Sequence, residues 1–189
     1  ISPGPIREDA EKHPKSAYAI SKLSIEYYLQ LYKKIHGLSS VSLRLANPYG
    51  PHQIAKSGQG VVAMFFEKLH KGDIIEVWGD GSAVRDFIYI DDVVEALIRV
   101  GQSHLEGEFN LGSGQGLSIS RILEEVCSSA GLEPRLKLLS SRGVDVSENV
   151  LNCEKLHLSL NWQPETPLSM GLRETANWWR AKSTKAQPL

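Results

Sequence analysis

Tyr18 and Lys22 stand four residues apart near the start of the chain. On an α-helix this spacing places both side chains on one face, close enough to share a ligand. An ammonium group beside a phenol favours the phenolate form, and a phenolate can take and return the proton of a hydroxyl group. The pair therefore predicts an acid/base centre. The spacing alone equally suits an amphipathic helix with a half-buried tyrosine and a solvated lysine.

The element that must position this pair is a long helix over residues 16–36. Ser16 can cap its start and Gly37 suits the left-handed residue after its end. Its apolar residues recur at helical spacing, at Ile20, Leu23, Tyr27, Leu31 and Ile35. Together these signals predict one long amphipathic helix.

A strand predicted over residues 41–45 follows the helix and stops at Asn47-Pro48. In open α/β sheets, ligands lie just past the carboxyl ends of strands, so Asn47 is well placed to meet one. An asparagine that merely closes a turn ahead of Pro48 suits the position as well.

The rest of the chain alternates strands and helices, which indicates an α/β fold. Strands are expected over 74–78, 87–90, 108–111 and 135–139. Helices are expected over 61–70, 119–130, 153–160 and 168–182, with another capped by Asp91 or Asp92 and running through residue 98. The sheet has few strands for its helices, as though part of it were missing.

Composition limits the function classes. The formal net charge of the 189 residues is −1 and no basic run occurs, so we expect no nucleic-acid partner. No apolar run is long enough to cross a bilayer and no signal peptide is evident, so we expect no membrane association. The cysteines, Cys127 and Cys153, match no metal-ligand spacing, which favours a reducing, cytoplasmic setting.

Seven short motifs, in order along nearly the whole chain, resemble the extended short-chain dehydrogenase/reductases of the NAD-dependent epimerase/dehydratase family, which act on nucleotide sugars. The motifs are Tyr18-Ala-Ile-Ser-Lys22, Leu43-Arg-Leu-Ala-Asn47-Pro-Tyr-Gly50, Trp78-Gly-Asp-Gly81, Arg85-Asp-Phe-Ile-Tyr-Ile90-Asp-Asp, Phe109-Asn-Leu-Gly-Ser-Gly114, Arg142-Gly-Val-Asp145 and Leu160-Asn-Trp-Gln-Pro164.

The resemblance implies a role for each matching residue. Tyr18 is the expected acid/base and Lys22 its partner, and both would bind NAD together with the backbone at Ala46. The expected ligands of a UDP-sugar are Asn47, Arg85 and Arg142 for the pyrophosphate, Gly60, Val61, Val77 and Trp78 around the nucleotide, Asp145 for the ribose hydroxyls, and Asn149 beside the sugar 2-position. Planar arginine forks suit the two charges of a pyrophosphate. The plainer readings are a surface ion pair between Arg85 and Asp86 and a local pair between Arg142 and Asp145.

The implied reaction is the interconversion of UDP-glucose and UDP-galactose, or of their 2-acetamido forms, by transient oxidation at C4. The alternatives are a nucleotide-sugar dehydratase, decarboxylase or reductase, and a non-catalytic fragment that binds a UDP-sugar.

The resemblance also implies an N-terminal half with a Gly-rich turn for the dinucleotide and a catalytic Ser or Thr. The residues before Tyr18 leave no room for either. We therefore expect the C-terminal half of the family fold, without the N-terminal Rossmann strands and inactive alone. Residues 1–50 would be a remnant of the NAD-binding domain, 51–182 the nucleotide-sugar region and 183–189 a tail. The full-length protein is expected to be a homodimer.

Overall fold

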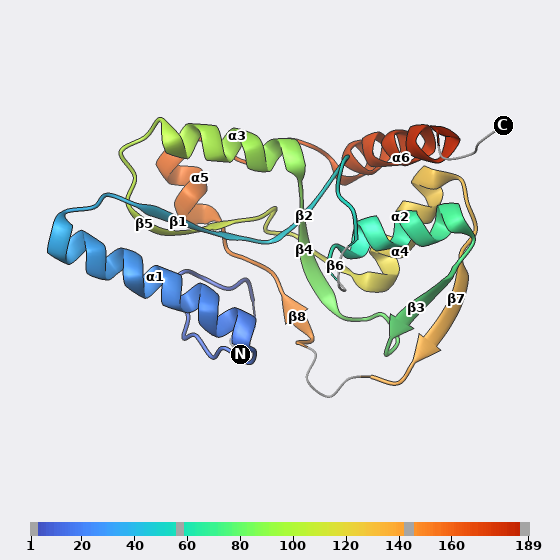
Figure 1. The fold of residues 1–189 in the computed structure, drawn as a ribbon, viewed down its shortest axis with the longest axis horizontal. Coiled ribbons are helices and arrows are strands. Elements are labelled where there is room, and N and C mark those ends of the chain that lie inside the picture. Colours follow the sequence, from blue (N-terminus) through green and yellow to red (C-terminus); the bar gives the residue numbers. More distant parts are fainter. Residues whose placement is uncertain (1–3, 56–58, 142–145, 186–189) are drawn as a thin grey trace.

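The structure, a computed structural model, describes residues 4–55, 59–141 and 146–185 (Figure 1). Helices and strands alternate along the chain, so the predicted α/β class is confirmed. The helices are α1 (Ala17–His36), α2 (Val61–Lys71), α3 (Ile90–Gly101), α4 (Ile119–Ala130), α5 (Glu154–Leu160) and α6 (Leu168–Lys185). No helix in these ranges is both long and apolar enough to cross a membrane.

The strands form three small sheets. β1 (Val41–Leu45) lies parallel to β5 (Gly107–Leu111), and β3 (Ile74–Trp78) lies parallel to β7 (Arg135–Leu139). In the third sheet, β4 (Val84–Tyr89) pairs in parallel with β2 (Asn47–Tyr49) and β8 (Glu148–Asn149), and antiparallel with β6 (Gly116–Ser118). β4 therefore joins segments from the start, middle and end of the chain.

Two hydrophobic clusters lie on the two sides of this central sheet. The first gathers α2, α4 and α6, with Phe66, Ile122 and Leu172 almost fully buried (Figure 1). The second lies between the β1–β5 pair and helices α3 and α5, and includes Phe109 and Leu156. Trp162 and Trp179 are buried as expected, and Trp178 is partly buried against the first cluster.

Local signals in the sequence correctly predicted where α1 and α4 begin and end. Ser16 accepts a hydrogen bond from the Ala19 N–H at 3.1 Å, and Gly37 adopts the left-handed conformation with φ +67°. Ser118 caps α4 in the same way, accepting from the Arg121 N–H, and Gly131 ends that helix. Each signal needs only neighbouring residues, which explains why sequence alone locates it.

Helix α1 forms as predicted, but the described residues leave its apolar side uncovered. None of its residues is buried, although Leu23 is partly covered. Ile20, Tyr27, Leu31 and Ile35 are exposed, because no described segment covers that side of the helix. What holds α1 to the β1–β5 pair is polar, as described below.

Several element boundaries differ from the prediction because distant segments set them. β4 begins at Val84 rather than residue 87, since β6 and β8 pair with Val84 and Arg85. The chain does not leave the sheet at Asn47 but continues as β2 beside β4. α6 runs to Lys185 instead of ending at residue 182.

The predicted cap of α3 is also wrong. α3 begins at Ile90 after Tyr89, with no side-chain cap. Asp92 is buried and its carboxylate accepts hydrogen bonds from the N–H groups of Glu165 and Thr166 instead. Asp92 therefore anchors the connection between α5 and α6.

Candidate functional site

Three predicted ligand residues meet where β2, β4 and β8 run side by side. Asn47 opens β2 opposite Phe87 of β4, and Arg85 of β4 lies opposite Asn149 of β8. The Asn47 side-chain amide donates to the Asp86 carbonyl oxygen at 2.8 Å, which fixes its orientation. Pairing to β4 thus brings together residues about a hundred positions apart in sequence.

A small cavity of about 140 Å³ opens beside these strands. It is lined by Arg44, Leu45, Ala46, Asn47, Asn149 and Leu151. Ala46 and Asn47 come from one motif and Asn149 lies about a hundred residues further along the chain, yet the three share one cavity. It combines an arginine and two amides with apolar side chains, a lining suited to a polar organic ligand.

The buried carboxylate of Asp86 holds this corner of the molecule together. Asp86 is 1% exposed. One oxygen accepts from the Ser113 N–H at 2.9 Å and the Ser113 hydroxyl at 2.7 Å, and the other accepts from the N–H groups of Gly114 at 3.1 Å and Leu151 at 3.3 Å. A Cβ at Gly112 would collide with this carboxylate, so the Gly112–Gly114 turn needs a glycine there.

The plainer reading of Arg85 and Asp86 as a surface ion pair is wrong. Successive strand residues point to opposite faces, and Asp86 is buried with its four donors. Arg85 instead donates to the carbonyl oxygen of Val84 at 2.7 Å. Asp86 stands in the motif that begins at Arg85, but its structural role was not predicted. All of its side-chain partners lie at least 27 residues away in sequence.

Tyr18 and Lys22 lie together in the first turns of α1, as their spacing predicts. The Lys22 Nζ is 5.4 Å from the centre of the Tyr18 ring, and Tyr18 is 63% exposed. The reading with a half-buried tyrosine is therefore wrong for this structure. Neither side chain lines the cavity at Asn47, and their catalytic roles stay predictions.

The other predicted nucleotide ligands sit at the ends of two elements. Gly60 precedes α2 with φ +79° and no side-chain cap. The Val77 side chain is buried in the core, so only its backbone can meet a ligand, whereas Trp78 at the end of β3 is 43% exposed. These residues do not line the cavity at Asn47. Arg142 and Asp145 lie outside the described residues.

The charged residue lining the cavity, Arg44, is held by the Glu26 carboxylate and the Glu8 carbonyl oxygen. The hydrogen bond to Glu26 raises the pKa of Arg44 above its ordinary value, against the opposing effect of partial burial.

The buried thiol of Cys153 has its pKa raised to about 12, chiefly by burial, so it is not a nucleophile at neutral pH.

Comparisons with family models and with known proteins indicate the same family. The model of the NAD dependent epimerase/dehydratase family matches residues 2–112. UDP-glucose 4-epimerase of Mycolicibacterium smegmatis is 33% identical over 180 residues, which cover 95% of this chain and 58% of that protein. The chain thus spans little more than half the length of this relative.

Solved structures agree with the sequence match. UDP-glucose 4-epimerase of Thermotoga maritima with UDP-glucose superimposes with a TM-score of 0.91 at 33% identity, covering 96% of this chain and 59% of that one. The Thermus thermophilus UDP-glucose 4-epimerase complex with NAD superimposes with a TM-score of 0.84 at 37% identity, covering 94% of this chain and 60% of that one. Relatives at 28–29% identity include a dTDP-sugar reductase of Escherichia coli and a human dTDP-D-glucose 4,6-dehydratase.

The residues present fit one end of NAD, the cofactor on which this family depends. Tyr18 and Lys22 offer a phenol and an ammonium to solvent on one helix face, a donor set suited to ribose hydroxyls. The printed sequence contains no Gly-x-Gly-x-x-Gly turn for the dinucleotide pyrophosphate. From the match over residues 2–112 and the fold shared with the two epimerase structures, we conclude that this chain belongs to the NAD dependent epimerase/dehydratase family.

Proposed function

We propose that this chain forms the nucleotide-sugar-binding part, with the Tyr/Lys pair, of an NAD-dependent 4-epimerase. The reaction interconverts UDP-glucose and UDP-galactose or their 2-acetamido forms. The observation that carries the proposal is the cavity shared by Ala46, Asn47 and Asn149 beside the strand of Arg85. The epimerases of Mycolicibacterium smegmatis and Thermotoga maritima support this choice of reaction.

The nucleotide is held by charge and by backbone groups. Arg85 and Arg142 neutralise the pyrophosphate, and Asn47 donates to it. The uncapped N-terminus of α2 at Gly60 and Val61 offers its first N–H groups to the same anion. The backbone of Val77 and the exposed Trp78 contact the uracil, and Asp145 accepts from the ribose hydroxyls.

Proton transfer falls to α1. Tyr18, with Lys22 beside it on the same helix face, removes the proton of the sugar 4-hydroxyl. Bound NAD supplies the acceptor and donor for the hydride at C4. The nucleotide stays anchored at Arg85 while the sugar rotates in the cavity to present its other face. Tyr18 then returns its proton to the 4-oxygen.

Product analysis tests this reaction in the protein that carries this sequence. With NAD and UDP-glucose, we expect UDP-galactose of unchanged mass, and Tyr18→Phe should lower the rate at least about 100-fold because the proton acceptor is lost. The matched control is Tyr28→Phe, another exposed tyrosine on α1. Equal rates for wild type and Tyr18→Phe would contradict the role of Tyr18.

A second candidate is a nucleotide-sugar dehydratase or reductase, favoured by the reductase and dehydratase relatives. Loss of water or net reduction of the sugar in the same assay would identify it. A third is a protein that binds a UDP-sugar without activity. Binding of UDP without turnover or NAD binding would identify that one.

We further propose that the complete enzyme is a cytoplasmic homodimer. The exposed apolar side chains of α1, including Tyr27 and Leu31, support a helix-to-helix interface. Sedimentation velocity on the complete protein tests it, and a monomer at micromolar concentration would contradict it.

A further inference from the structure

The helix that carries Tyr18 and Lys22 is joined to the described sheet largely by polar side chains. None of its residues is buried. Glu26, Gln30 and Lys33 recur at helical spacing, so they share one face. They contact Arg44, Glu108 and Glu106, at distances of 2.7, 2.8 and 2.5 Å.

Arg44 makes the most enclosed of these contacts. Its Nε and Nη2 donate to the two carboxylate oxygens of Glu26 at 2.8 and 2.7 Å, a two-point fork. The two side chains are 23% and 12% exposed, the least exposed ion pair in the described ranges. A planar guanidinium in a fork fixes direction as well as distance, which a single ammonium does not.

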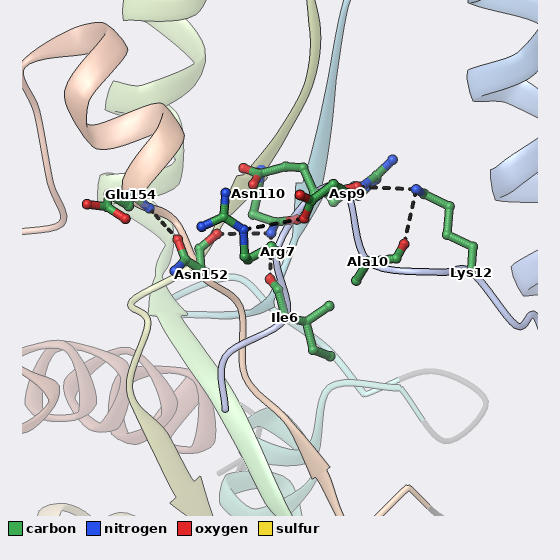
Figure 2. A network of polar contacts seen from close by, with 10 residues as sticks. Ile6, Arg7, Asp9, Ala10, Lys12, Asn110, Asn152 and Glu154 are labelled. Atoms are coloured by element: carbon green, nitrogen blue, oxygen red, sulfur yellow. Dashed lines mark hydrogen bonds and ion pairs between the residues drawn. The ribbon is translucent and has the colours of Figure 1, made fainter. Parts of the chain in front are cut away.

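The network continues from Arg44 toward the segment that follows Asn149. The Arg44 Nη1 donates to the Glu8 carbonyl oxygen at 2.8 Å, and the Glu8 carboxylate accepts from the Asn110 N–H at 2.9 Å. Figure 2 shows the side-chain amide of Asn110 between Ile6 and Asn152; it donates to both carbonyl oxygens, at 2.8 and 2.9 Å.

The same segments are tied together by their backbones. The Ile6 N–H donates to Val150, and the Asn152 N–H donates back to Ile6. An unbroken set of hydrogen bonds thus runs from α1 through β1 and residues 6–8 to residues 150–152. Arg44 itself also lines the cavity that holds Asn47 and Asn149.

We infer that Arg44 is a positioning residue, which, through Glu26 and Glu8, sets the placement of the Tyr18 helix relative to the cavity. This inference rests on the proposed function in one respect, namely that α1 carries the group that accepts the proton of the sugar hydroxyl. The placement of α1 itself can be measured without any nucleotide.

Backbone hydrogen exchange tests the placement in the chain as it is. In Arg44→Met, exchange within residues 17–36 should rise about tenfold, because charge-assisted hydrogen bonds to a partly enclosed carboxylate are lost. Exchange in α2 and α4 should stay unchanged. Arg44→Lys should give an intermediate rise, and exchanging the charges in Glu26→Arg/Arg44→Glu should restore part of the protection.

The matched control is Arg99→Met, which breaks an exposed ion pair with Glu95 inside α3 and should leave α1 unchanged. Unchanged exchange of α1 in Arg44→Met would overturn the inference. A uniform rise across all helices would also overturn it, since Arg44 would then stabilise the whole fold rather than place one helix.

Kinetics of the complete enzyme separates this inference from the proposed function. Arg44→Lys should lower kcat about tenfold with KM for the UDP-sugar changed less than about twofold, because the nucleotide anchors remain. A rise of KM by about tenfold with unchanged kcat would instead place Arg44 among the substrate ligands and overturn the positioning role. If the wild type has no epimerase activity, the reaction proposed above fails, whereas the exchange result still decides the role of Arg44.

Discussion

At the scale of single residues, the burial of Asp86 sets the clearest test of stability. Asp86→Ala leaves four hydrogen-bond donors without their acceptor, three of them backbone N–H groups. We expect a loss of about 3 kcal/mol in the free energy of unfolding, measured by urea titration. Asp91→Ala, at an exposed neighbour on α3, should cost less than about 0.5 kcal/mol. Similar losses in the two variants would contradict the role given to Asp86.

Asn149 sets a test of sugar choice. It lines the cavity with Ala46 and Asn47. We propose that it lies beside the sugar 2-position, where an asparagine, smaller than an aromatic side chain, leaves room for a 2-acetamido group. We expect calorimetric titration to show UDP-N-acetylglucosamine binding about as tightly as UDP-glucose. Asn149→Tyr should weaken the binding of UDP-N-acetylglucosamine at least about tenfold by steric exclusion, and should change the affinity for UDP-glucose little. Strict rejection of the acetamido sugar by the wild type would contradict the idea.

At the scale of elements, the polar attachment of α1 predicts a pH dependence. The hydrogen bond from Lys33 lowers the pKa of Glu106, and that from Gln30 lowers the pKa of Glu108. Each carboxylate therefore adds stability above the ordinary carboxyl pKa of about 4.3, and loses it as the pH falls through the lowered folded-state value.

The free energy of unfolding should accordingly fall as the pH drops from about 5 to about 3. The double variant Glu106→Gln/Glu108→Gln should show a shallower fall in urea titrations across the same range, since both titrating groups are gone. An identical slope in wild type and variant would show that these carboxylates do not hold α1.

The elements also show what sequence could and could not predict. Helix ends at Ser16, Gly37, Ser118 and Gly131 were predictable because capping involves only adjacent residues. β6 and β8 were missed because strands of two or three residues exist only through their pairing with β4. The exposure of α1 could not be predicted from its apolar pattern, because such a pattern does not reveal whether a covering segment is present.

At the scale of the whole molecule, motif order identified the family. The structure brings Ala46, Asn47 and Asn149 to one cavity, and their ligand roles stay predictions. The polar framework around that cavity was not predictable. Arg44 and Asn110 lie in strands that also contain the polar residues Ser42 and Glu108, and their partners Glu8 and Asn152 lie 36 and 42 positions away. Such pairings follow from the fold and have no local signature in the sequence.

The proposed site for a nucleotide sugar beside β4 is tested most directly by calorimetric titration of this chain with UDP-glucose. We expect saturable binding that Arg85→Ala weakens at least about tenfold, because a charge-assisted contact to the pyrophosphate is lost. Arg99→Ala, the exposed control on α3, should bind as the wild type does. No binding by the wild type, or equal affinity in the Arg85→Ala variant, would contradict it.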